Sequence, residues 1–515
     1  MKTFTRLLAL LLACLSLVAL VVACAEVTYD PDDLLIDAAY DAKGRLRDDL
    51  PSTLNYGGEK INVMHWKAEN SEFEITDVSK NNVENAIYDR NDQIQRRLNV
   101  DLEWSECLGH SGMVENFVNQ VAIYAESSTA TVDIIATYAP TMGVLAIRGY
   151  MMDFAKIQKQ ATEANPFYVS LDKPWWPQQL VETVSFGNSY YFLSGDISTN
   201  VLYMMHMLYI NKDMFTEKKI ELPYSKVYDG TWTLDELIQI TTGIYKNGDA
   251  IPGKSAGDTF GLVGRSYVLD AFYVGSNMHY ILADTSDAGN LLNISSDLSS
   301  SKTVKLVSKL GDMFASNDWM TRKFGDQTGE DIEDISTFAK GRALVVQQHA
   351  QIGEKNLMGK VNFEFGVLPM PKYDTNQKNY YTNVGNPITL YGLFVGMDNR
   401  GDMPKTLSMM SAVLECWASE GYRLTTPEIF NVNMQLKVAE DQTETDMFEY
   451  IRSGITFDIG RFFATELGQV STRVGYCMAT NSSWSTYWGA YSRSLQASLT
   501  EIVEDFKEYE REHDY

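Results

Sequence analysis

Two kinds of hydrophobic pattern alternate along the first third of the chain. Short apolar runs predict strands, and between them lie segments whose apolar residues recur at helical spacing. The strands are expected at residues 60–66, 100–104 and 131–138, and the helices at 82–98 and 113–127. This order is typical of a parallel sheet covered by helices. Because such sheets bind ligands beyond the carboxyl ends of their strands, we expect Trp66 and Tyr138 to face a ligand.

A second section with the same alternation begins near residue 200 and continues towards the carboxyl terminus. Its apolar runs are again short, and its last stretch has the spacing of an amphipathic helix. The apolar runs lie at residues 201–210, 341–348 and 363–369, and the final helix is expected at 491–510. The chain therefore predicts two α/β regions rather than one.

Two helix starts are indicated by local sequence. Thr233 is the expected N-cap of one helix, and Glu236 lies where it would complete a capping box. Trp232 would pack on Leu237 across this start, so we interpret Trp232 as structural rather than ligand-binding. Asn82 is the expected N-cap of the helix that begins there.

An apolar segment without charge covers residues 7–25 and follows a positively charged start. A membrane-spanning helix and a secretory signal share these features, but a signal ends in small residues at a cleavage point. The sequence Val-Val-Ala before Cys24 is the pattern in which bacteria attach lipid to a cysteine, whereas Cys14 leaves too short an apolar core. We predict a signal peptide at 1–23, a lipid anchor on Cys24 at the outer face of the cell membrane, and an acidic flexible stalk at 24–57.

The net charge of −25 at pH 7 narrows the classes of partner. It excludes nucleic acid, which needs a positive surface to release counterions. Cys107, Cys416 and Cys477 remain after the predicted cleavage and form no CxxC, so one disulfide and three free thiols are both open. The histidines form no HExxH motif and no close cluster, so neither a metal site nor a cofactor is expected.

Several short motifs follow one another in a recognisable order. They are KPWWP from Lys173, SGDIS from Ser194, YINKDMF from Tyr209, FAKGRAL from Phe338 and FGVLPMPKY from Phe365. Together with the lipidation pattern and the opening strands and helices, this order resembles the bacterial extracellular solute-binding proteins of family one. These proteins are the capture components of ABC importers, mostly for sugars.

The resemblance implies an α/β, two-lobed fold of the periplasmic-binding-protein type (type II), with a hinge that the chain crosses more than once. The crossings are expected near Asp196, at 385–391 and within 455–472. A ligand would lie in the cleft between the lobes, which would close on it. The resemblance places residues 58–198 and 391–455 in the N-terminal lobe, and residues 199–390 and 456–515 in the C-terminal lobe.

The function implied is capture of a carbohydrate, in particular an oligosaccharide, by a monomeric, non-enzymatic protein that delivers it to ABC permease subunits. Two alternatives stay open: a surface glycan-degrading lipoprotein, and a sensory or adhesive lipoprotein on the same fold. Many relatives carry a calcium loop, but here only Asn247 and Asp249 remain as ligands beside Lys246, so no ion is predicted. A glycosidase would need two carboxyl groups around one bond, and the acidic run at 330–334 is typical of a solvated loop instead.

Sugars present apolar faces and a belt of hydroxyls, so their sites need flat aromatic walls and a few fixed polar groups. Besides the two strand-end residues, the resemblance adds Trp175 and Trp176, for which a loop brace is the alternative. Asp196 lies at a predicted crossing and would reach hydroxyls, with a cap or hinge role as its alternative.

The C-terminal lobe supplies the remaining candidates. Gln348 and His349 end a predicted strand and would face the ligand. Trp484 and Trp488 are spaced four apart on one helical face, where a core stripe is the alternative. The resemblance therefore implies that Trp66, Tyr138, Asp196 and one of Trp484 and Trp488 share one interlobe cleft. The late tryptophan would close over a sugar held by the other three residues.

Overall fold

The structure is a computed structural model that describes residues 39–41, 43–68, 70–77, 81–127, 132–185, 187–284, 291–322, 333–436 and 441–512. The expected signal peptide, Cys24 and the first part of the expected stalk lie outside these residues. The chain divides into two units, residues 1–54 and residues 55–515. In the first unit, Tyr40 and Leu46 form an antiparallel bridge.

The second unit contains a first sheet, for which the described residues supply four strands in the order β12-β3-β1-β2. β1 runs parallel to β2 and β3, whereas β12 is antiparallel to β3. Every residue of β3 and β12 is buried, as expected for strands covered on both faces. The strands are β1 (Glu59–Trp66), β2 (Val100–Cys107), β3 (Ile134–Tyr138) and β12 (Thr389–Leu393).

The described part of the second unit also contains a second sheet of five strands in the order β10-β4-β9-β5-β8. β4 is antiparallel to both β10 and β9, and β5 is parallel to β9 and β8. The strands are β4 (His206–Asn211), β5 (Phe260–Arg265), β8 (Trp319–Arg322), β9 (Ala343–His349) and β10 (Phe365–Leu368). Two further pairs are β6 (Ile281–Ala283) with β7 (Leu292–Ile294), and β11 (Thr382–Asn383) with β13 (Ile455–Thr456).

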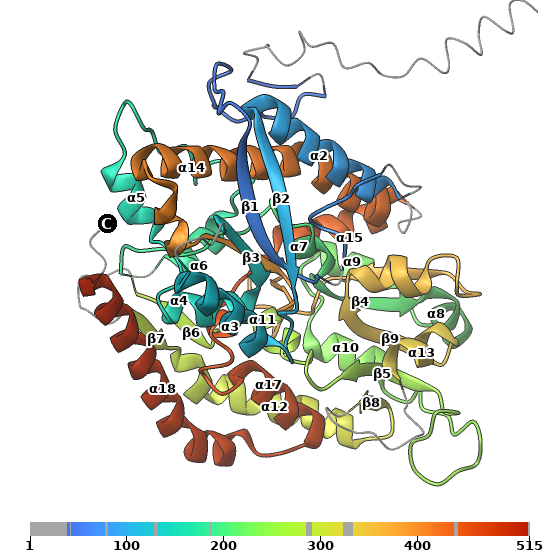
Figure 1. Cartoon of the computed structure of the whole chain (residues 1–515). Coiled ribbons are helices and arrows are strands. Elements are labelled where there is room, and N and C mark those ends of the chain that lie inside the picture. The colour runs from blue at the N-terminus through green and yellow to red at the C-terminus, as the bar shows by residue number, and fades with distance from the viewer. Residues whose placement is uncertain are drawn as a thin grey trace, which may run out of the picture. The chain divides into compact units, whose positions relative to one another are not determined.

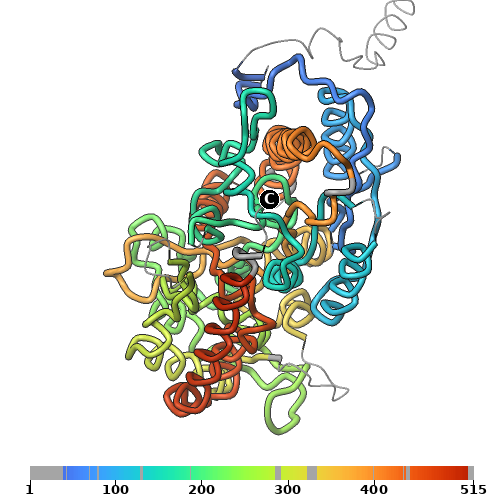
Figure 2. The backbone as a smooth tube through the Cα atoms, turned by 60° about the vertical axis from the view of Figure 1, so that its left-hand side comes forward, coloured from blue at the N-terminus to red at the C-terminus, as the bar shows by residue number. Residues whose placement is uncertain are grey.

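Helices pack beside both sheets (Figure 1). α2 (Asn82–Leu98) packs on β2, and α14 (Met403–Glu420) lies beside α2 although the two are far apart in sequence (Figure 2). The first part of the chain also forms α3 (Val114–Ala125), α4 (Ala139–Ile147), α5 (Phe154–Gln160), α6 (Gln178–Val184) and α7 (Asn200–Tyr203). Around the second sheet lie α8 (Lys212–Lys218), α9 (Tyr224–Tyr228), α10 (Leu234–Thr241), α11 (Ala271–Gly275), α12 (Ser301–Ala315) and α13 (Asp334–Ala339). The last helices are α15 (Gln442–Ser453), α16 (Ile459–Phe462), α17 (Val470–Thr480) and α18 (Trp484–Glu512).

We call the region around the first sheet the first lobe and the region around the second sheet the second lobe. The chain leaves the first lobe after Leu193, which bridges to Tyr391 of β12, and reaches β4 through α7. It returns between Val384, which bridges to Met205, and Thr389 at the start of β12. After α14 the chain passes again to the second lobe, where α15 packs on β10.

None of the described helices combines the length and the hydropathy that a membrane span requires. Within the described residues, Cys107, Cys416 and Cys477 form no disulfide with one another, which resolves the two alternatives left by their number.

Two local expectations differ from the structure near element ends. The N-cap of α2 is Asn81, which accepts hydrogen bonds from the first free backbone N–H groups, so the prediction of Asn82 is wrong by one residue. The apolar run at 201–210 holds the end of α7 and most of β4, because hydrophobicity alone does not separate a short helix from a strand.

The predicted capping box of α10 is also wrong. Thr233 occupies the N-cap but its side chain makes no cap hydrogen bond, and its backbone instead pairs with Lys372 in a parallel bridge. Trp232 is buried and donates its indole N–H to the carbonyl of Pro369 at 3.0 Å, which confirms its structural role.

The loop before β5 uses its oxygens within the protein. Asp258 accepts from the backbone N–H groups of Gly248 at 3.0 Å and Ser255 at 2.9 Å. The Lys254 ammonium group donates to the carbonyls of Phe314 and Trp319, at 2.7 and 2.6 Å. The Lys254 side chain therefore anchors this loop to the end of α12 and the start of β8.

Candidate functional site

The carboxyl ends of β1 and β3 bring two aromatic side chains together at one edge of the first sheet. The ring centroids of Trp66 and Tyr138 are 5.4 Å apart, and both side chains are buried. The Trp66 indole N–H donates to Thr389 Oγ1 at 2.8 Å, which holds the ring against the start of β12. These two candidates from the sequence thus share one aromatic surface.

Two histidines and a glutamine meet where β4 begins and β9 ends. Because β4 and β9 are antiparallel, His206 is paired with His349, and their ring centroids are 4.3 Å apart. Gln347 lies on the same face of β9 as His349, and its Nε2 is 2.9 Å from Nδ1 of His206. Since an amide N–H only donates, Nδ1 accepts, and the proton of a neutral His206 lies on Nε2.

Arg461 of α16 lies close to both of these groups. Its guanidinium forms a buried ion pair with Asp270, the residue before α11. It interacts electrostatically with Tyr138 from the first lobe and with His206 from the second. We call Tyr138, His206, Asp270, Gln347 and Arg461 the interlobe polar cluster.

Several buried atoms of the interlobe polar cluster lack a hydrogen-bond partner in the part of the chain that the structure describes. They are His206 Nε2, Asp270 Oδ1, Gln347 Oε1 and Arg461 Nε. A buried polar group left unpaired costs about 1–3 kcal/mol, and nearly all such groups in proteins are paired. Other unpaired atoms occur elsewhere, for example Nε1 of Trp417 in α14, but here donors and acceptors gather around one ion pair. Hydroxyl groups of a bound molecule would complete these bonds.

The charge of the interlobe polar cluster is balanced at neutral pH. Burial, and then His349 and Arg461, hold the pKa of His206 well below its usual value. Burial and the charge of Arg265 lower the pKa of His349 to about 4, so both imidazoles are neutral. Burial lowers the pKa of Arg461 to about 10, which leaves it charged opposite Asp270. The cluster therefore suits an uncharged ligand.

A second group of buried polar residues lies next to Trp66. Its first member, Glu72, is on the loop after β1. Glu72 Oε1 accepts from the Tyr391 hydroxyl at 2.9 Å, and Oε2 accepts from the Thr389 hydroxyl at 3.0 Å and from the Asn200 amide. Burial raises the pKa of Glu72. We call Glu72, Asn200, Thr389 and Tyr391 the Glu72 cluster. It joins the segment that leaves the first lobe to the segment that returns.

The paired tryptophans of the first lobe make a different contact. Trp175 and Trp176 are buried, and their indole N–H groups donate to the two carboxylate oxygens of Glu415 in α14, at 3.1 and 2.9 Å. The backbone N–H of Ser170 also donates to this carboxylate, at 3.1 Å. Both rings thus fix a loop onto α14.

Two polar candidates bond within the protein. Asp196 accepts from the Thr426 hydroxyl at 2.6 Å, and burial raises its pKa. Gln348 donates to Asp334 at 2.6 Å, and the same carboxylate accepts from Arg265 Nε at 2.6 Å. The acidic neighbours Glu330 and Asp331, considered for hydrolysis, lie outside the described residues.

The late tryptophans lie at the start of α18. Trp484 is buried and donates to the carbonyl of Leu298 at 2.7 Å, and its ring stacks on Trp488 with centroids 5.9 Å apart. α18 packs beside α12 and β7 (Figure 1). This pair therefore packs against the α12 and β7 side of the molecule, whereas Trp66 contacts Tyr138 and Thr389 of the first sheet.

The sequence did not reveal most of the interlobe polar cluster. His206 was visible as a polar residue inside an apolar run, and this was a usable signal. Gln347 directly precedes Gln348 and His349, the two residues of β9 that were predicted to face the ligand. Its side chain lies on the face of β9 opposite to that of Gln348. Asp270 and Arg461 have no local signature, because their pairing joins distant parts of the chain.

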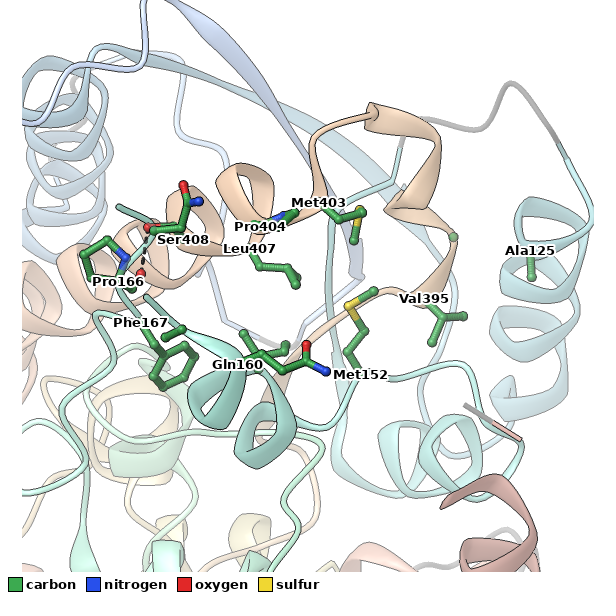
Figure 3. A pocket seen from close by; sticks show the side chains of 14 residues that line it. Ala125, Met152, Gln160, Pro166, Phe167, Val395, Met403, Pro404, Leu407 and Ser408 are labelled. Carbon is green, nitrogen blue, oxygen red and sulfur yellow. Dashed lines mark hydrogen bonds between the residues drawn. The ribbon is translucent and has the colours of Figure 1, made fainter. Parts of the chain in front are cut away.

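A separate cavity of about 600 Å³ lies in the first lobe, at the end of β12 away from the interlobe polar cluster (Figure 3). Met152, Phe167 and Leu407 are among the apolar side chains that line it. On its wall, the Ser408 hydroxyl donates to the carbonyl of Pro166 at 2.7 Å. Its apolar lining differs from what a hydroxyl-rich ligand needs.

No protein-family model matches the chain, and no curated protein matches it in sequence. Among solved structures, it is similar to an ABC substrate-binding protein from Listeria monocytogenes in complex with cycloalternan. That match has 11% identity and a TM-score of 0.51, and it covers 87% of this chain and 98% of the other. A sugar transporter from Rhizobium etli in an open conformation has 12% identity and a TM-score of 0.52, over 87% of this chain and 99% of the other. The fold is therefore the two-lobed α/β fold of periplasmic binding proteins, which confirms the predicted fold class.

Proposed function

We propose that this protein binds an uncharged carbohydrate, in particular an oligosaccharide, between its lobes and delivers it to an ABC permease. The proposal rests on the gathering of unpaired, buried donors and acceptors in the interlobe polar cluster. A sugar hydroxyl both donates and accepts, so one ring would satisfy His206 Nε2 and Gln347 Oε1 together. The aromatic surface of Trp66 and Tyr138 would receive the apolar face of the sugar.

The transport role is supported by the fold. The two similar structures are named a substrate-binding protein and a sugar transporter. In folds of this type, ligand contacts to both lobes favour a closed arrangement by population shift. Here Tyr138 belongs to the first lobe and His206 to the second, and Arg461 interacts with both.

The proposed role is binding without covalent chemistry. Hydrolysis of a glycosidic bond requires two carboxyl groups on either side of it. Within the described residues, the interlobe polar cluster has one carboxylate, Asp270, and Arg461 is paired with it. This setting favours recognition of hydroxyls over general acid catalysis.

The proposed location is the outer face of the cell membrane. Removal of residues 1–23 would leave Cys24 as the first residue, carrying lipid, and residues 24–57 would join the anchor to the folded part. Cells that express Cys24→Ala should show no fatty-acid label on the protein. Label at the unsubstituted level would contradict this assignment.

Calorimetric titration and thermal shift with a panel of neutral mono- and oligosaccharides test the binding function. A ligand that binds only the folded protein should raise the melting temperature in proportion to its affinity. Arg461→Met should weaken binding of that ligand by about 2 kcal/mol, roughly thirtyfold, because a charged donor is lost. Arg493→Met, at an exposed position of α18, is the matched control and should bind as the unsubstituted protein does. Binding of no neutral carbohydrate, or equal affinity of Arg461→Met, would contradict the proposal.

A further inference from the structure

Two adjoining cavities lie on the second lobe, outside the interlobe polar cluster. One has a volume of about 550 Å³ and the other about 300 Å³, and they share Tyr228, Tyr450 and Ser453 as walls. The larger one is also lined by Tyr380 and Tyr381. We call the space around these four tyrosines the tyrosine pocket.

The aromatic walls of the tyrosine pocket are held in place. Tyr450 packs edge-on against Tyr228 and Tyr380, with ring centroids 6.1 and 5.8 Å away. The Tyr380 ring lies under the Lys372 ammonium group at 5.3 Å, and its hydroxyl donates to the carbonyl of Val227 at 3.2 Å. Tyr228 remains 45% exposed. A fixed aromatic surface of this kind binds apolar faces with little loss of side-chain entropy.

Polar groups surround these rings. Asp446, in the smaller cavity, accepts from the Tyr228 hydroxyl at 2.8 Å, and Glu449 lies on the same wall. The larger cavity adds the amide side chains of Gln179 and Asn379. Aromatic faces with carboxylates and amides beside them match the alternating CH and hydroxyl surfaces of a sugar.

The tyrosine pocket adjoins the interlobe polar cluster through β11. Tyr381 lines the pocket, and two residues later the Asn383 amide donates to Asp270 Oδ2 at 3.4 Å. Residues two apart in an extended segment share one face, and they are separated by about 7 Å. β13 also links the tyrosine pocket to the interlobe polar cluster. Thr456 of β13 lines the pocket, and Arg461 of the cluster follows it shortly afterwards in the chain.

We propose that the tyrosine pocket binds additional sugar residues of an oligosaccharide whose first residues occupy the interlobe polar cluster. This inference rests on the proposed function, since it extends the same ligand along β11. It predicts that affinity grows with chain length, and that the tyrosines contribute only to the longer ligands.

Calorimetric titrations of the full-length protein with linear glucans and mannans, from disaccharides to hexasaccharides, test this inference. The unsubstituted protein should bind the hexasaccharide of the preferred series more tightly than the disaccharide. Tyr228→Ala should weaken hexasaccharide binding about tenfold and leave disaccharide binding unchanged. Tyr381→Ala, changed at a partly exposed position of the same pocket, should act in the same direction.

Tyr476→Ala is the matched control, because Tyr476 is 48% exposed on α17 and does not line the pocket. It should bind every length as the unsubstituted protein does. Equal weakening of short and long ligands by Tyr228→Ala, or no weakening at all, would overturn the inference while leaving the proposed function intact. Failure of the unsubstituted protein to bind any member of either series would overturn the inference, and failure with the whole panel of neutral carbohydrates would overturn the proposed function as well.

Discussion

The Glu72 cluster and the interlobe polar cluster are both buried, both polar, and separated by little more than the ring of Trp66. Each oxygen of Glu72 accepts at least one hydrogen bond, and the donors come from both crossing segments. In the interlobe polar cluster, atoms such as Gln347 Oε1 have no partner within the described part of the chain. One cluster is complete without a ligand, and the other is not.

This difference separates buried polar residues that stabilise the fold from buried polar residues that are available to bind a ligand. A saturated buried network stabilises one arrangement of the backbone, because breaking any bond leaves a desolvated group behind. An unsaturated one lowers the stability of the free protein and gains the missing bonds on binding. Both clusters are buried and polar, so burial and polarity alone do not distinguish them, whereas hydrogen-bond satisfaction does.

The strongest test of this comparison is the removal of the Glu72 carboxylate. Glu72→Leu should lower the free energy of unfolding by about 3 kcal/mol, because it leaves the Thr389 hydroxyl and the Asn200 amide without this acceptor and removes one of the two acceptors near the Tyr391 hydroxyl. Urea denaturation measures the change. Glu72→Gln keeps one acceptor oxygen and should lose less. A Glu72→Leu protein with an unchanged urea midpoint would show that the saturated cluster is not structural.

Effects of intermediate size are expected from variants of two adjacent residues of β9, Gln347 and Gln348, and these variants make the comparison sharper. Gln348→Met should lower the free energy of unfolding by about 1–2 kcal/mol, since Asp334 loses a buried donor, and should leave carbohydrate affinity unchanged. Gln347→Met should instead lower carbohydrate affinity about tenfold, because Oε1 has no partner within the described residues and is open to a ligand, and it should also lose the hydrogen bond to His206 Nδ1.

These two variants serve as controls for each other, because both glutamines are buried on the same strand and differ in the face they occupy. Denaturation curves and titrations on the same samples give both quantities. Parallel losses of stability and affinity in the two variants would contradict the division of roles between the faces of β9.

The last expected effect is a pH dependence. The folded-state pKa of His349 is about 4, below the usual 6.5, so the unfolded chain binds more protons between these values. The contribution of the neutral ring to stability should therefore be complete above about pH 6.5 and should be lost as the pH falls towards about 4. The charge of Arg265 opposes protonation of His349 in the same direction as burial, and His349 in turn lowers the pKa of His206.

Urea denaturation of the unsubstituted protein and of His349→Asn should be measured across this pH range. Because the same carboxylates titrate in both proteins, the difference between their stabilities reports the contribution of His349. The stability difference between the two proteins should shrink as the pH falls. A difference that stays constant with pH would show that His349 is not held neutral by its surroundings.

The sequence predicted what depends on local pattern. The strands at β1, β2 and β3 follow from short apolar runs, and the neighbouring positions of Trp66 and Tyr138 follow from parallel strands that end at one edge. The resemblance to solute-binding proteins added the type of fold and the crossings between the two α/β regions. Both predictions depend on short stretches of sequence or on the order of short motifs along the chain.

What the sequence could not show depends on contacts between distant residues. Trp175 and Trp176 have a composition suited to sugar, yet their N–H groups bind Glu415 in a helix that is far along the chain. Asp270 and Arg461 are ordinary in their local context and become a candidate site only through their pairing. Whether a buried atom lacks a partner is a property of the folded chain and has no local pattern.

The antiparallel strand β12 has a consequence for the order in which the lobes fold. All described strands of the second sheet lie between residues 206 and 368, whereas the first sheet needs β12, which follows them. During synthesis, the second sheet therefore becomes complete while β3 still has an open edge. Such an edge is a template for pairing with another chain. A chain that ends before Thr389 would keep a contiguous second sheet but would expose β3 to aggregation.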